Sequence, residues 1–211
     1  MKAMPEPTSS RDKILDVAES LFARRGYAGI GLREVAEASG LSKSSLFHHF
    51  RSKEQLYHEV LLRMLQHIEE RFAAASSDGE SPRAQLERWI SELIDILAEH
   101  PTIPRLLLRS IFEEEDAVSP EADATEQRMA AILGDAESLI RRGVECGELR
   151  PVSAAHTLQT LIGATVYHFA SAEVGEGILG RPLFSADEVA RRKREVLSLL
   201  QHGLFTRPAT P

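Results

Sequence analysis

The sequence of 211 residues contains a single cysteine, Cys146, and few aromatic side chains, which make up 6% of the chain. One cysteine cannot form an internal disulfide, so the composition gives no sign of an oxidising compartment. No run approaches the roughly 18 apolar residues of a membrane-spanning helix, and the first residues, MKAMPEPTSSRDK, lack the apolar stretch of a signal peptide. We therefore expect a cytoplasmic protein with no membrane partner.

Negative charge is missing from one short window of an otherwise acidic chain. The formal net charge is −7, yet residues 38–53 contain no acid and carry Lys43, Arg51 and Lys53. The first 60 residues have a net charge of +1 and the remaining residues a net charge of −8. Because an acidic surface repels nucleic acid, the first quarter of the chain is the part that can approach it.

Apolar residues recur at helical spacing along most of the chain, and no segment shows the alternation of a strand. We predict an all-α protein of about nine helices. The predicted domains are a disordered tail over 1–8, a helix-turn-helix DNA-binding domain over 9–52, a helical effector-binding and dimerisation domain over 53–205, and a disordered tail over 206–211. The predicted loops cover 76–82, 113–125 and 173–185.

The acid-free window predicts a short helix that begins after Ser42, a residue type suited to the N-cap position. At about 100° per residue, one side of this helix carries polar and cationic residues with one aromatic, and the other side carries Leu46 and Phe50. Together with the preceding short helix and a turn at Gly40, this is the pattern of a helix-turn-helix. The apolar side would anchor the helix, and the acid-free side would enter the major groove of DNA.

The segment GLREVAEASGLSKSSLFHHFRSKEQLYHEVL resembles the DNA-binding domain of the tetracycline-repressor (TetR) family of bacterial regulators, and the resemblance covers about residues 9–60. It implies a three-helix head that binds DNA, a larger helical body that binds a ligand, and a homodimer. No cofactor is implied. The implied partners are a double-stranded DNA operator, a small-molecule effector and a second copy of the chain.

Carried onto this sequence, the family's DNA contacts fall on Arg33, Lys43, Ser44, Ser45, Phe47, His48, His49 and Lys53. Arg33 is expected at a base edge, Lys43 and Ser44 in the groove, and His49 and Lys53 at phosphates. Three departures weaken the match, and one of them is that Ser44 and Ser45 replace the family's Gly-Thr pair. Ile30 and Gly31 stand where the family has a hydroxyl residue, and Phe47 replaces its usual tyrosine.

Effector and dimer residues are predicted from the apolar stripes of the body, although each is also what ordinary helix packing uses. The candidate pocket residues are Met64, His67, Ile68, Trp89, Leu93, Phe112, Met129, Tyr167 and His168. The candidate interface residues are Leu161, Gly163, Ala164, Val196, Leu200 and Leu204. The helix from Ser52 to about Ala75 is predicted to be the only element that links pocket and head directly.

The leading interpretation is a ligand-responsive regulator, usually a repressor, that binds a pseudo-palindromic operator as a dimer. A helical enzyme is a second class, but the sequence shows no nucleophile–base pair. Adjacent His48 and His49 diverge on a helix and cannot share a metal, and GEGILG at residues 175–180 is interpreted as an interhelical loop. A third class is a ligand- or partner-binding protein whose head has lost DNA binding through the changes at Ile30, Gly31 and Phe47.

Overall fold

The computed structural model describes residues 9–77, 79–112 and 120–206, and the side chain of Phe112 lies outside this description. The described part contains ten helices, one more than predicted, and no strand beyond an isolated bridge between Leu149 and Phe205. The helices are α1 Ser10–Arg25, α2 Leu32–Ala38, α3 Lys43–His49, α4 Lys53–Ala75, α5 Pro82–Glu99, α6 Thr102–Phe112, α7 Pro120–Glu145, α8 Ala154–Ala170, α9 Ala172–Leu179 and α10 Ala186–Gly203.

Serine side chains set the start of the first, third and fourth helices, as the sequence predicts. The hydroxyl oxygens of Ser9, Ser42 and Ser52 accept hydrogen bonds from the backbone N–H groups three residues later, at 3.1, 3.1 and 3.0 Å. Each bond satisfies a donor that the first helical turn leaves without a partner. Gly40 has a φ of 68° in the turn between α2 and α3, a backbone conformation that glycine adopts readily.

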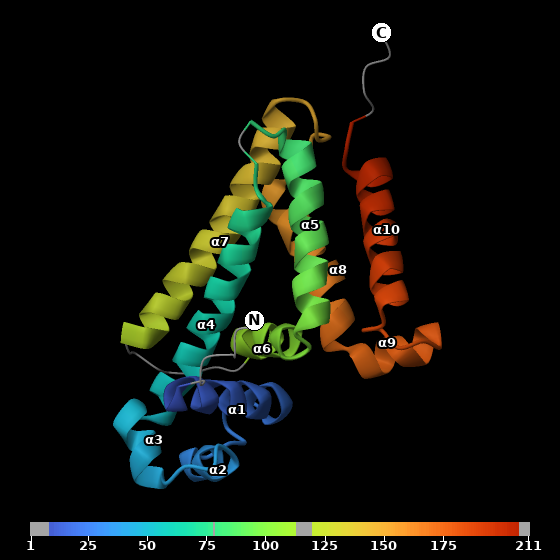
Figure 1. The fold of residues 1–211 in the computed structure, drawn as a ribbon. Helices are drawn as coiled ribbons and strands as arrows, with labels where there is room; N and C mark the ends of the chain where they lie inside the picture. The colour runs from blue at the N-terminus through green and yellow to red at the C-terminus, as the bar shows by residue number, and fades with distance from the viewer. Residues whose placement is uncertain (1–8, 78, 113–119, 207–211) are drawn as a thin grey trace, which may run out of the picture.

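Helices α1, α2 and α3 form a small head at one end of the molecule (Figure 1). Its core contains Phe22, Val35, Leu46 and Phe50, all fully buried. Helices α4 to α10 form the body, in which α4, α5 and α7 run lengthwise and pack against one another, while α8 packs on α5 and α7. Helix α10 packs along α5 at the edge of the body.

Helix α9 corrects the sequence analysis, which placed a loop over 173–185. The segment GEGILG is helical through Leu179 and ends at Gly180, whose φ is 64°. Gly175 packs closely on Leu183, because a Cβ atom at this position would lie 2.6 Å from Leu183 Cδ1 and would displace that side chain. The N–H of Leu183 donates to the Glu176 carboxylate at 3.1 Å, which ties the end of this segment back onto α9.

The bounds of other predicted loops and tails also differ from the prediction. Helix α7 already begins at Pro120, so the last part of the predicted loop 113–125 is helical, and 113–119 lie outside the described residues. Of the predicted tails, 1–8 and 207–211 also lie outside them. Thr206, assigned to the second tail, is held in place because its N–H donates to the carbonyl oxygen of Glu148 at 3.0 Å.

Both α4 and α6 connect the body to the head. Helix α4 packs on α1, and Arg63 of α4 donates to Asp16 at 2.7 Å and Glu19 at 2.8 Å. Helix α6 lies at the end of the body next to α1 (Figure 1), where Arg109 donates to the carbonyl oxygens of Ala23 and Arg24, each at 3.3 Å. The prediction that α4 alone links pocket and head is therefore wrong.

Candidate DNA-binding and ligand-binding sites

Helix α3 presents the face that the sequence predicts. Lys43, Ser44, Phe47 and His48 are exposed, whereas Leu46 and Phe50 are fully buried against the head. The ammonium group of Lys43 lies 5.5 Å from the centre of the Phe47 ring, so a cation and an aromatic face stand together on this surface. Ser45 and His49 are half-buried at the flanks of the helix. The exposed face is thus free of acids and mounted on an apolar back.

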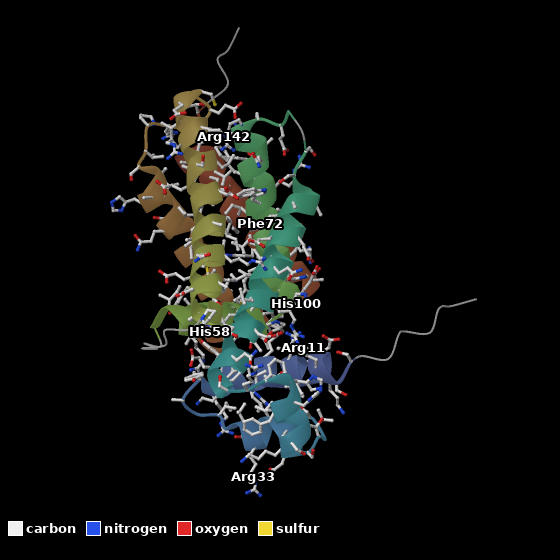
Figure 2. All side chains as sticks on the ribbon, turned by 90° about the vertical axis from the view of Figure 1, so that its left-hand side faces the viewer. Arg11, Arg33, His58, Phe72, His100 and Arg142 are labelled. Carbon is white, nitrogen blue, oxygen red and sulfur yellow. The ribbon has the colours of Figure 1, made fainter. Side chains whose placement is uncertain are left out.

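Arg33 projects from α2 at the tip of the head, which Figure 2 shows as the end of the molecule farthest from the body. Its Nε atom donates to a carboxylate oxygen of Glu37 at 2.8 Å. This hydrogen bond, together with the charge of Glu37, raises the pKa of Arg33. Both side chains are exposed, so the guanidinium can exchange this partner for a phosphate or a base edge.

Lys53 is engaged within the chain, and its contact with a phosphate stays a prediction. Its ammonium group donates to the carbonyl oxygens of Tyr27 and Ile30, at 2.9 and 3.1 Å. It also lies 4.0 Å from the centre of the Tyr27 ring. In this arrangement Lys53 holds the turn between α1 and α2, and two of its three N–H groups are already used.

A cavity of about 190 Å³ lies in the body between α4, α5, α6, α7 and α8. Four of the predicted pocket residues line it, namely Ile68, Trp89, Leu93 and Met129. The other lining residues are not among the predicted pocket residues; they are Leu65, Phe72, Leu86, Ile90, Leu107, Ile111, Ile132, Leu133, Ala136, Ile140, Leu158, Leu161, Ile162 and Val166. The only sequence signal for them is the apolar spacing that also predicts ordinary core residues.

The remaining pocket candidates lie elsewhere in the body. Met64 is buried one turn before Ile68 and is not part of the cavity wall. His67 packs edge-on against His100, with ring centres 4.8 Å apart, and burial followed by the charge of His100 lowers its pKa. Tyr167 and His168 line a separate recess between α8, α9 and α10. Phe112 has a side chain outside the described residues.

The recess beside α8 perturbs the protonation of a histidine. Burial, and after it the positive charge of Arg192 on α10, lowers the pKa of His168 to about 4. Burial also lowers the pKa of Arg192. The same recess is lined by Gly163 and Ala164, two of the predicted interface residues, and both are exposed.

The other four predicted interface residues are already used inside the chain. Val196 and Leu200 of α10 and Leu204 directly after it are buried, with 3, 6 and 7% of their surface exposed, and α10 packs on α5. Leu161 is buried in the cavity wall. Their assignment to a dimer interface is therefore corrected, because the stripe that the sequence shows is the stripe that binds α10 to its own body. The outer face of α10 exposes Leu199, with 71% of its surface accessible.

Two further findings concern ions and membranes. Among the described residues, no group of three or more His, Cys, Asp or Glu side chains is arranged to hold a metal ion. Within the same residues, no helix combines the length and apolarity needed to span a bilayer.

Comparison with known proteins identifies the family. The profile described as "Bacterial regulatory proteins, tetR family" matches residues 14–60, and the profile "Tetracyclin repressor-like, C-terminal domain" matches residues 82–200. The transcriptional repressor AcnR of Corynebacterium glutamicum is 28% identical over 82% of this chain and 88% of its own. The transcriptional regulator RutR of Escherichia coli K12 is 27% identical over 86% of this chain and 83% of its own.

Solved structures show the same fold. The ketosteroid transcriptional regulator KstR2 of Mycobacterium tuberculosis superposes with a TM-score of 0.77 at 20% identity, covering 96% of this chain and 98% of its own. AibR in complex with isovaleryl coenzyme A and operator DNA superposes with a TM-score of 0.68 at 19% identity, covering 82% and 97%. Since the two profiles together cover most of the sequence, the chain belongs to the TetR family of bacterial transcriptional regulators.

Proposed function

We propose that this TetR-family regulator represses transcription by binding a pseudo-palindromic operator as a homodimer, and that a small apolar effector in the body cavity releases it. The observation that carries the proposal is the exposed, acid-free face of α3 on a fully buried apolar back. In a chain of net charge −7, such a face is suited to the phosphate-lined major groove. The proposal is a binding function without catalysis, exercised in the cytoplasm where the DNA lies.

The cavity can influence the head along two routes. Helix α4 carries Ile68 and Phe72 in the cavity wall and Lys53 against the head. Helix α6 carries Leu107 and Ile111 in the wall and Arg109 against the end of α1. A ligand that fits only one arrangement of these helices shifts the balance between bound and released heads. Moving the protein from mostly bound to mostly released takes about 5.5 kcal/mol of differential affinity.

Support for a dimer comes from the exposed faces of α8 and α10. Gly163 and Ala164 leave room for close approach by another helix, Tyr167 offers apolar surface in the same recess, and Leu199 is exposed on α10. A two-fold interface uses the same patch on both copies. The two copies of α3 would then lie about 34–36 Å apart, matching successive major grooves.

The test is salt-dependent binding to the DNA upstream of the protein's own gene, followed by fluorescence anisotropy. Lys43→Ala is expected to weaken operator binding at least tenfold and to lower the salt slope by about one unit. Arg142→Ala is the charge-matched control, because Arg142 lies at the opposite end of the molecule from Arg33 (Figure 2). Equal binding by wild type and Lys43→Ala across the titration would overturn the proposal.

A further inference from the structure

The described wall of the body cavity is made of apolar side chains alone. Every described lining residue is Leu, Ile, Val, Ala, Met, Phe or Trp. The one side-chain donor among them, Trp89 Nε1, already donates to Ser76 Oγ at 3.2 Å. Thr165 stands beside two lining residues of α8, but its hydroxyl donates to the carbonyl oxygen of Leu161 at 2.8 Å. The backbone offers little either, because the wall is helical and its N–H and C=O groups bond within the helices.

Two titratable side chains of α4 near the cavity are engaged with other side chains rather than with the cavity. Arg71, one residue before Phe72, donates to Glu92 and Glu99 on α5, the latter at 2.7 Å. His67 contacts His100 instead of lining the wall. A charged ligand group inside the cavity would therefore have no partner among the described lining residues, and an unpaired charge in an apolar site is strongly disfavoured.

The aromatic residues of the wall do not form a cage for a cation. Phe72 and Trp89 are the aromatic residues among the described lining side chains, and they stack on each other with ring centres 5.1 Å apart and planes 5° from parallel. One face of each ring is thus covered by the other. Figure 2 shows Phe72 about halfway along the body, well away from His58 and the head. Recognition of a quaternary ammonium group uses several open ring faces around the charge.

The size of the cavity limits what can enter. A closed apolar cavity of about 150 Å³ binds benzene, and this cavity, whose lining residue Ile111 is exposed to solvent, is about 190 Å³. It therefore has room for a hydrocarbon group of roughly six to nine carbon atoms at ordinary packing density.

We propose that the cavity selects a neutral hydrocarbon group of this size and rejects the same group when it carries a charge of either sign. This inference rests on the proposed function, because it specifies the chemistry of the effector that the regulator senses. It adds that the cavity recognises its ligand without a hydrogen bond or an ion pair, so that the shape and the lack of charge of the ligand decide which ligand binds.

The test uses three probes with the same ring and similar size, which are ethylbenzene, benzoate and benzylammonium. Trp89 is the single tryptophan of the chain and lies in the cavity wall, so its fluorescence reports occupancy directly. Titration of the purified full chain without DNA is expected to show saturable binding of ethylbenzene. Benzoate and benzylammonium are expected to bind at least about 100-fold more weakly, since the wall offers neither charge a partner. Binding of either ion within tenfold of ethylbenzene, or no saturable binding of ethylbenzene, overturns the inference.

A matched pair of variants on α7 places the probe in the cavity. Ala136 lines the wall, whereas Ala130 is exposed and lies outside it. Ala136→Phe is expected to reduce ethylbenzene affinity at least tenfold by filling the space, and Ala130→Phe to leave it within twofold. Equal affinity in the two variants would place the binding elsewhere. The probe series on the wild-type chain decides the question even if Ala136→Phe does not fold.

Operator binding is measured separately, so the two proposals can fail separately. Selective binding of ethylbenzene to a protein that does not bind its operator would leave the cavity chemistry standing and overturn the proposed function. Normal operator binding by a protein that binds benzoate as tightly as ethylbenzene would overturn the proposed selectivity of the cavity and leave the proposed DNA-binding function standing.

Discussion

At the scale of single residues, Lys53 shows how one side chain can have two plausible roles. It stands at the start of α4 beside the acid-free window, where a phosphate contact is the natural expectation. The structure instead points its ammonium group at two backbone carbonyls and the face of Tyr27. Hydrogen bonds from a charged donor each contribute about 1.5–3 kcal/mol, so this arrangement is a substantial reason for the turn between α1 and α2 to keep its shape.

We predict that Lys53→Ala lowers the free energy of unfolding by about 1–3 kcal/mol, because the carbonyls of Tyr27 and Ile30 lose a charged donor. Operator affinity is expected to fall as well, with the salt slope at its wild-type value, because the ammonium group is engaged inside the head. Urea denaturation and anisotropy at several salt concentrations measure the two effects. Lys43→Ala is the matched comparison, with a lower slope and unchanged stability. A reduced slope with normal stability for Lys53→Ala would restore the phosphate contact that the family resemblance implies.

His168 is expected to make the stability of the fold depend on pH. Its pKa is lowered to about 4 by burial and by Arg192, while an unfolded histidine has a pKa of about 6.5. Between these values the unfolded chain binds a proton that the folded chain refuses, so stability falls as the pH falls from about 6.5 to about 4. Since the side chain is only half-buried, solvent screening reduces the effect to roughly 1 kcal/mol.

The measurement for His168 is urea denaturation of the wild type and of His168→Gln at pH 7 and pH 5. The wild type is expected to lose roughly 1 kcal/mol more than the variant between the two pH values. His58 and His67, whose pKa values are also lowered, are present in both proteins and cancel in the comparison. The same pH dependence in both proteins would show that His168 titrates normally.

At the scale of helices, α10 is an element that the sequence predicts without predicting its packing partner. Its apolar stripe predicts an amphipathic helix but does not say which neighbour the stripe meets. The stripe meets α5 of the same chain, so the residues assigned to a dimer interface lie in the core. The cavity shows the same limit. Met64 and Ile68 lie one turn apart on α4, yet only Ile68 lines the wall, and helical spacing treats both alike.

Helix α9 was missed for a related reason. Three glycines within residues 175–180 favour a loop, because each glycine weakens a helix by about 1 kcal/mol relative to alanine. Tertiary contacts overcome that preference here, since Gly175 admits Leu183 and Ala172 is buried. In contrast, the head was predictable element by element, because its serine caps and its turn glycine are local signals that need no distant partner.

Adjacent residues of α10 give a direct test of its two faces. Leu200→Asp is expected to destabilise the fold by at least about 3 kcal/mol, because it buries an unpaired charge against α5. Leu199→Asp places the same charge on the exposed face, and is expected to keep the helical content while converting the dimer to a monomer. Circular dichroism with thermal melting and light scattering at micromolar concentration distinguish the two. A folded Leu199→Asp that remains fully dimeric would move the interface away from this face.

At the scale of the whole molecule, the head and the body are joined at several points rather than by one hinge. Arg63 reaches Asp16 and Glu19 from α4. From α6, Thr102 donates to Glu19 at 2.6 Å and Arg109 caps the end of α1. Such a connection fixes the orientation of α3 relative to the body. In the proposed dimer, the two bodies therefore set the distance between the two copies of α3. Charge follows the same division, because residues 1–60 have a net charge of +1 and residues 61–211 a net charge of −8.

The rigidity of this connection predicts a strict spacing of operator half-sites. Five extra base pairs between the half-sites would turn the second site by about half a helical turn and move it about 17 Å along the axis. A head held by Arg63, Thr102 and Arg109 cannot follow that displacement without breaking these contacts, so only one head would bind. We expect the affinity for the spaced operator to fall at least about 100-fold, to the level of a single half-site.

Fluorescence anisotropy with synthetic operators of normal and lengthened spacing measures this change. A ten-pair insertion is expected to weaken binding similarly. The two half-sites then face the same side of the DNA, but the distance between them is about 34 Å too long. Unchanged affinity for the five-pair insertion would mean that the heads move independently of the bodies, and ligand binding in the cavity could then not control their register.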